Sequence, residues 1–156
     1  MAQKYVLTKQ LKAVPLDQPI ESGASVVEVI TTQEFAKLGV AGADTLSALR
    51  TLTEAESTYL DVFSDSLIGS FAVPDKKDLM GETIKFAFYL NKANLIFIDE
   101  GQVCTRLLDD IERIGVLKEP TAAHCLFEFM KLLVKDDLTY LADVEDRMED
   151  VEEQII

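Results

Sequence analysis

The stretch from residue 120 to residue 156 constrains the fold most, because it reads as one long helix. At 1.5 Å per residue, a helix of this length spans roughly 55 Å, about twice the width that a domain of this size needs. Its distal half carries apolar residues at alternating spacings of three and four, the a and d positions of a heptad. These residues, called the seam below, are Leu141, Val144, Met148, Val151 and Ile155. The seam predicts that the helix leaves the domain and packs against another helix.

Followed upstream, the heptad frame passes through Asp137, Val134, Met130 and Phe127. A carboxylate is costly in a dry seam, so we expect Asp137 to lie where the helix leaves the domain, with its carboxylate in solvent. The proximal half of the helix is expected to pack on the domain. The chain stops at Ile156 without a Gly, Asn or Pro to end a helix, which favours a longer helix whose remainder lies beyond this sequence.

The net charge of −13 is concentrated in this helix. Residues 136–156 contain nine acids and a single base, Arg147. Nucleic acids and anionic membrane surfaces both need clustered Lys and Arg for their main attraction, and this chain has no such cluster. The balance excludes both partners and favours cations or basic proteins.

Four of the acids recur at spacings of three, four and three, so they share one side of the helix: Asp143, Asp146, Asp150 and Glu153. We call this set the acidic stripe. Its like charges repel, and a divalent cation such as Mg²⁺ could relieve that repulsion through retained waters. Two interpretations stay open: a stripe that attracts cations, or an acidic helix that is kept soluble by its charge and pairs with basic helices.

The first 119 residues read as one α/β domain. Alternating or β-branched runs predict strands at 5–7, 11–14, 26–30, 59–63, 67–73, 84–90 and 95–98. Thr31 and Glu34 form a capping-box pattern for a short helix, and Asp44 could cap a second over 46–52. Helical spacing over 103–114 ends at Gly115, and Pro120 suits the first turn of the next helix. The prediction is an α/β/α sandwich with a mixed central sheet, followed by a long, stalk-like C-terminal helix.

The search for catalytic residues is negative. His124 is the only histidine, so a site with two imidazole ligands is excluded. Cys104 has no second Cys or His near it in sequence and is interpreted as a structural thiol, whereas Cys125 points about 100° away from the neighbouring His124 around the helix. Two isolated cysteines and no signal peptide favour the cytosol, and no apolar run reaches the length of a membrane span.

The remaining carboxylates and glycines give no site either. The pairs at 99–100 and 109–110 are expected to be solvated surface groups, because adjacent helical residues diverge. Neither a P-loop nor a GxGxxG pattern is present. We therefore expect no enzyme, no cofactor and no assignable metal ligands in this chain.

Several stretches resemble the cytosolic domain of CorA-type magnesium transporters. They are LIFIDE at 95–100, LFEFMKLLV at 126–134 and LTYLADVEDRMEDVEEQII at 138–156, with FSDSLIGSFAVP at 63–74 similar to central strands of that domain. The resemblance covers residues 59–156. It implies a funnel-type α/β domain over 1–119 and the start of a stalk helix over 120–156. It also implies a homopentamer whose membrane helices and Gly-Met-Asn motif would follow Ile156.

The resemblance further implies a cytosolic regulatory domain that senses Mg²⁺ and supports assembly. The domain would lie at the cytosolic face of a cell membrane, and only sequence after Ile156 would attach it to that membrane. Mg²⁺ would be the transported or regulatory ion. Such proteins sense it through acids between subunits, and Asp44, Glu54 and Glu56 lie in the corresponding neighbourhood without an assigned ligand role. The alternatives are a cytosolic adaptor whose acidic helix docks a basic partner helix, and a small α/β enzyme working with a second chain.

Overall fold

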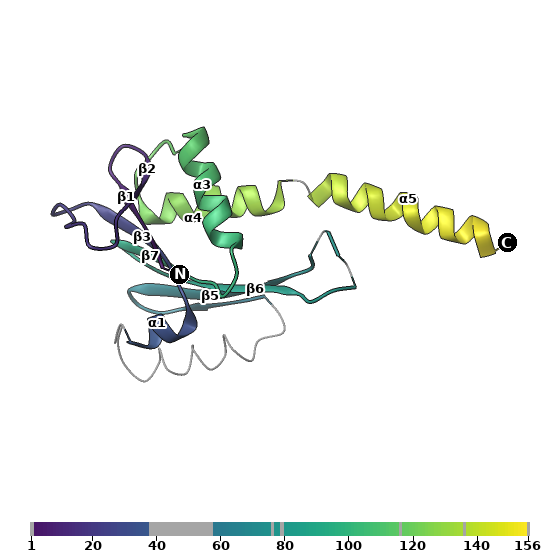
Figure 1. Cartoon of the computed structure of the whole chain (residues 1–156), viewed down its shortest axis with the longest axis horizontal. Coiled ribbons are helices and arrows are strands. Elements are labelled where there is room, and N and C mark those ends of the chain that lie inside the picture. Colours follow the sequence, from purple (N-terminus) through teal and green to yellow (C-terminus); the bar gives the residue numbers. More distant parts are fainter. Residues whose placement is uncertain are drawn as a thin grey trace.

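A seven-stranded mixed sheet forms the centre of the molecule (Figure 1). The computed structural model describes residues 2–37, 58–75, 77–78, 80–115, 117–135 and 137–155. The strands are β1 Gln3–Leu7, β2 Leu11–Val14, β3 Ser25–Ile30, β4 Tyr59–Val62, β5 Ser66–Val73, β6 Ile84–Asn91 and β7 Asn94–Ile98. Their order is β2-β1-β3-β7-β6-β5-β4. Only the β3–β7 pairing is parallel, which confirms a mixed sheet.

Successive side chains of the central strands alternate between two apolar clusters, so both faces of the sheet are apolar. In β7, Leu95 and Phe97 belong to the larger core cluster, whereas Ile96 and Ile98 belong to a smaller one on the opposite face. Successive side chains of a strand point to opposite sides, so a strand that is apolar at every position must be covered twice. The sheet is therefore the middle layer of a three-layer fold.

Helices cover both faces. The short helix α1, Thr32–Lys37, contributes Phe35 to the smaller cluster. Helices α3, Val103–Ile114, and α4, Ala122–Val134, contribute to the larger cluster and lie on the other side of the sheet (Figure 1). The predicted α/β/α sandwich is confirmed for the described residues, and the second short helix predicted at 44–52 lies outside them.

Local sequence signals explain the helix ends. The backbone N–H of Thr31 donates to the Glu34 carboxylate at 2.8 Å, and the Glu34 N–H donates to Oγ1 of Thr31 at 3.2 Å, so the capping box is formed. Gly115 ends α3 with φ of 69°, a left-handed conformation that glycine adopts without strain. Thr121 caps α4 by accepting from the His124 N–H. Pro120 thus lies just before the cap rather than in the first turn.

The long C-terminal helix is not continuous, which corrects the interpretation of 120–156 as one helix. Helix α4 ends at Val134, where the Lys135 N–H bonds to the Leu132 carbonyl only three residues back. Helix α5 begins at Asp137 and runs to Ile155. An acidic residue favours a helix N-terminus through the helix dipole, so Asp137 suits this new start. Asp137 lies where the chain leaves the domain, as expected, although its side chain is only partly exposed.

Candidate interaction surface

Several carboxylates of the domain hold its helices in place. Asp99 follows β7 and is buried, and its carboxylate accepts from the backbone N–H groups of Gly101 at 2.8 Å and Cys104 at 2.9 Å. The Cys104 bond satisfies a donor in the first turn of α3 that has no partner within the helix, and the Gly101 bond holds the loop just before it. The expectation that Asp99 is a solvated surface acid was wrong, because a short loop folds its side chain back over the helix end.

The other predicted surface acids also have structural partners. Glu100 accepts from the Thr32 backbone N–H at 2.8 Å, and this hydrogen bond lowers the pKa of the Glu100 carboxyl. Asp109 accepts from the Tyr5 hydroxyl at 2.7 Å. Burial, and then this bond, raise the pKa of Tyr5. The Tyr5 and Asp109 pair therefore ties β1 to α3.

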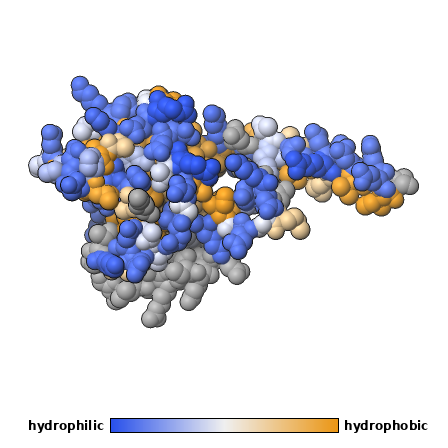
Figure 2. Space-filling view, viewed as in Figure 1, coloured by the Kyte–Doolittle hydropathy of each residue, from blue (hydrophilic) through white to orange (hydrophobic). Residues whose placement is uncertain are grey.

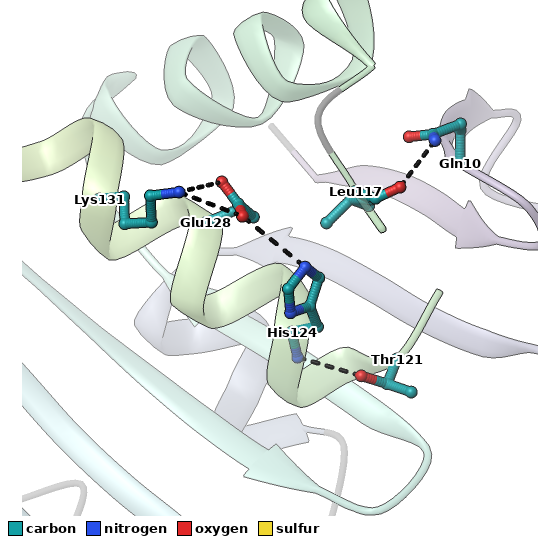
Figure 3. Close-up of polar contacts among 6 residues, drawn as sticks. All are labelled: Gln10, Leu117, Thr121, His124, Glu128 and Lys131. Carbon is teal, nitrogen blue, oxygen red and sulfur yellow. Dashed lines mark hydrogen bonds and ion pairs between the residues drawn. The ribbon is translucent and has the colours of Figure 1, made fainter. Parts of the chain in front are cut away.

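A cluster of ionisable groups lies along α4 (Figure 3). The Glu128 carboxylate is buried, and it lies 3.7 Å from Nε2 of His124 and 3.4 Å from Nζ of Lys131. His124 is partly buried, as expected, and its Nε2 makes no hydrogen bond within the described structure. All three residues come from one helix at spacings of three and four, so the cluster neutralises a carboxylate that packing has buried.

Both thiols are buried, which agrees with the interpretation of Cys104 as a structural thiol. Cys104 and Cys125 are fully buried in the larger core cluster and are not bonded to each other. Burial, and then the Asp99 carboxylate, raise the pKa of Cys104, whereas burial raises the pKa of Cys125 to about 12. A thiol that stays protonated is a poor nucleophile and a poor metal ligand.

An exposed apolar groove runs along α5. Helix α5 has no buried residue and projects from the domain (Figure 1), and the seam residues lie together along one side of it. Met148 and Ile155 are 67% and 80% exposed. Figure 2 shows apolar side chains gathered along one side of this helix and hydrophilic ones along the other. The groove is lined by the five seam residues together with Glu145, Arg147, Glu149 and Glu152.

The acidic stripe lies on a different side of α5. Its four residues are exposed, and none of them lines the groove. Asp146, for example, is two residues from both Val144 and Met148, a spacing at which helical side chains do not face each other. Asp143 pairs with Arg147 at 3.0 Å. Among the described residues, no three His, Cys, Asp or Glu side chains come together in a way that could hold a metal ion.

Neither a protein-family model nor a curated protein sequence matches the chain, whereas solved structures do. The full-length CmaX protein superposes with a TM-score of 0.71 at 18% identity, over 97% of this chain and 50% of that one. The soluble domain of CorA from Methanocaldococcus jannaschii gives 0.66 at 18%, over 99% and 64%. The chain has the fold of the CorA soluble domain. The cytoplasmic domain of ZntB from Vibrio parahaemolyticus RIMD 2210633 agrees, with 0.66 at 8% identity, over 95% and 63%.

These similarities extend the CorA-type resemblance from residues 59–156 to nearly the whole chain. The chain spans between half and about two thirds of the length of these three proteins. Among the helices that the structure describes, none is both long enough and apolar enough to cross a membrane. The site residues predicted on α5, both seam and stripe, remain predictions about function.

Proposed function

We propose that this chain is the cytosolic domain of a divalent-cation transporter of the CorA type, with Mg²⁺ as the ion it transports or senses. The observation that supports this is the likeness of fold, which runs over 95–99% of the chain to the cytoplasmic or soluble domains of ZntB and CorA and to CmaX. The whole protein would be a homopentamer at the cytosolic face of a cell membrane.

In this proposal the acidic stripe couples assembly to cations. Each like-charge pair along the stripe costs a few tenths of a kcal/mol within one helix, and bringing copies of α5 near one another adds further close pairs. Hydrated Mg²⁺ neutralises two charges at once without a dedicated cage of protein ligands. Cations held in this way would favour the assembled state.

Transport by the whole protein is tested in cells. The complete reading frame that contains residues 1–156 is expressed in a strain that lacks its own Mg²⁺ uptake, and growth is measured against external Mg²⁺. We expect growth at lower Mg²⁺ than the empty vector allows, and two apolar segments preceded by Gly-Met-Asn in the frame after Ile156. A stop codon directly after Ile156 would contradict the proposal.

Cation coupling is tested by sedimentation of a chain that carries the complete helical stalk. Millimolar Mg²⁺ should tighten association more than NaCl of equal ionic strength, and the double substitution Asp146→Asn with Asp150→Asn should reduce the difference. Equal effects of the two salts would leave only general screening, and the stripe would lose its role. The 156-residue chain by itself should associate weakly at most, because its seam covers only about two heptads.

A further inference from the structure

The two edges of the central sheet differ in how they are protected. At the β2 edge, the backbone N–H of Ala13 donates to the Glu112 carboxylate of α3 at 3.2 Å. Pro15, which has no N–H to donate, directly follows this strand. An unpaired edge strand is a template for pairing with another chain, and a covering helix or a proline blocks such pairing. The β2 edge is therefore blocked by its own chain.

The other edge of the sheet is β4, whose hydrogen-bonding groups are arranged differently. The Phe63 N–H donates to the Ser66 carbonyl at 2.9 Å across the turn between β4 and β5. In an antiparallel pair, opposite residues alternate between bonded and non-bonded pairs, so Asp61, two residues back, also bonds to β5. Leu60 and Val62 therefore point their N–H and C=O groups away from β5. Among the described residues, no strand pairs with this outer edge.

The same two residues present apolar side chains. Leu60 and Val62 are 56% and 71% exposed. They lie on the face of the larger core cluster, because Val62 is opposite Leu67, which packs against that cluster. Asp61 lies between them and is exposed on the other face of the strand. The edge thus has an apolar–acidic–apolar pattern, with an outward N–H and C=O at each apolar position.

We propose that the outer edge of β4 binds an extended segment of another protein in which a Lys or Arg stands between two apolar residues. An antiparallel strand would place its apolar residues opposite Leu60 and Val62 and its basic residue opposite Asp61. The Cα atoms of that central, non-bonded pair would be about 4.5 Å apart, so the basic side chain reaches the carboxylate. Backbone hydrogen bonds give such a strand its affinity, and the alternating side chains give it specificity.

A second copy of β4 fits this edge less well. The register that pairs Leu60 with Val62 in both directions would bring the two Asp61 carboxylates opposite each other, and like charges directly opposite destabilise a sheet. In one neighbouring register, Val62 would lie opposite the polar Thr58. In the other, Leu60 would lie opposite Ser64. A strand with a central basic residue keeps both apolar pairs and reverses the sign of the charge contact.

The proposal goes beyond the transport role and does not depend on it. It is tested on the ¹⁵N-labelled 156-residue chain with a synthetic peptide of alternating Thr and Val that carries Lys at its centre. A peptide with Glu in place of Lys is the matched ligand control. Binding of the Lys peptide should slow amide hydrogen exchange at Leu60 and Val62, which would donate to the added strand, and leave exchange at Ala13 unchanged. Chemical-shift changes give the dissociation constants.

Asp61→Lys is the variant that tests the charge contact. One cross-strand charge pair changes affinity by about 1.4- to 5-fold. The native chain should therefore prefer the Lys peptide, and Asp61→Lys should prefer the Glu peptide. Because the Asp61 side chain is exposed, this substitution should leave the fold and its amide spectrum otherwise unchanged.

Val62→Pro tests the backbone contact. It removes an outward N–H while the bonds of Asp61 to β5 remain, a position in which edge strands tolerate proline. Losing this hydrogen bond should weaken binding about 2- to 12-fold. Val62→Thr keeps the N–H and the branched shape, so it should weaken binding less than Val62→Pro does.

Three results would overturn the proposal. The first is that neither peptide binds at millimolar concentration, and the second is that Asp61→Lys leaves the preference unchanged. The third is that exchange slows at Ala13 rather than at Leu60 and Val62. Slower exchange at Leu60 and Val62 when the chain alone is concentrated would assign the edge to a second copy instead.

Discussion

Phe129 joins α4 to the central sheet, and its removal gives the sharpest test of the packing. The side chain is fully buried, with its ring centroid 4.3 Å from that of Phe97 on β7 and 5.8 Å from that of Phe86 on β6. Truncation to Ala removes a buried aromatic ring and leaves a cavity, which costs about 3–5 kcal/mol. That is a large part of the roughly 5–15 kcal/mol that a domain of ordinary stability has.

Phe127 supplies a matched control on the same helix. Its side chain is 56% exposed, and its ring centroid lies 6.0 Å from that of His124 and 5.5 Å from the Lys131 ammonium group. An exposed cation–π contact contributes about 0.5–1 kcal/mol, so Phe127→Ala should cost no more than about 1 kcal/mol. The two variants delete the same atoms two residues apart, on opposite sides of α4.

Urea unfolding followed by circular dichroism measures both effects. With a slope of about 2 kcal/mol per M, Phe129→Ala should lower the unfolding midpoint by about 2 M and Phe127→Ala by less than about 0.5 M. Phe129→Leu, which keeps most of the volume, should fall between them and gives a measurement if the Ala variant does not fold. Similar losses for Phe127→Ala and Phe129→Ala would refute the assignment of the buried face of α4.

Three further outcomes follow from the polar and thiol groups. Neither Cys104 nor Cys125 should react with a thiol reagent at about pH 8 in the folded protein, because burial keeps the thiols protonated. Both should react in denaturant, and rapid labelling of the native chain would contradict their burial. Asp99→Ala should cost about 1–2 kcal/mol in the free energy of unfolding, since it removes the acceptor for the Cys104 N–H in the first turn of α3 and for the Gly101 N–H in the preceding loop. An unchanged urea midpoint would show that these two bonds are dispensable. The folded pKa of Glu100 is depressed, so its stabilisation is present above the unfolded pKa and is lost as pH falls through the folded pKa. Glu100→Gln should therefore flatten the stability profile below about pH 4.5, measured by thermal unfolding, and an unaltered profile would exclude its bond to Thr32 as the cause.

The sequence by itself determined the strands and the helix ends, because these depend on neighbours along the chain. The alternation in β6 and β7 predicted the hairpin, and the capping box at Thr31 and Glu34 formed as expected. Gly115 ended α3 because only its left-handed backbone completes the last turn without strain. The seam could also be predicted from the sequence, since residues at spacings of three and four share one face of a helix wherever the helix lies.

Tertiary structure decided which residues far apart in sequence lie next to each other. Only the folded sheet places β3 beside β7 in parallel, although more than sixty residues separate them in sequence. The break between α4 and α5 was missed, because the heptad frame resumes beyond Asp137 and no Gly or Pro marks the break. Asp99 looked like a surface acid until the fold brought its carboxylate back over the start of α3. Local patterns record each residue's neighbours along the chain, whereas burial and pairing depend on contacts that only the packed layers create.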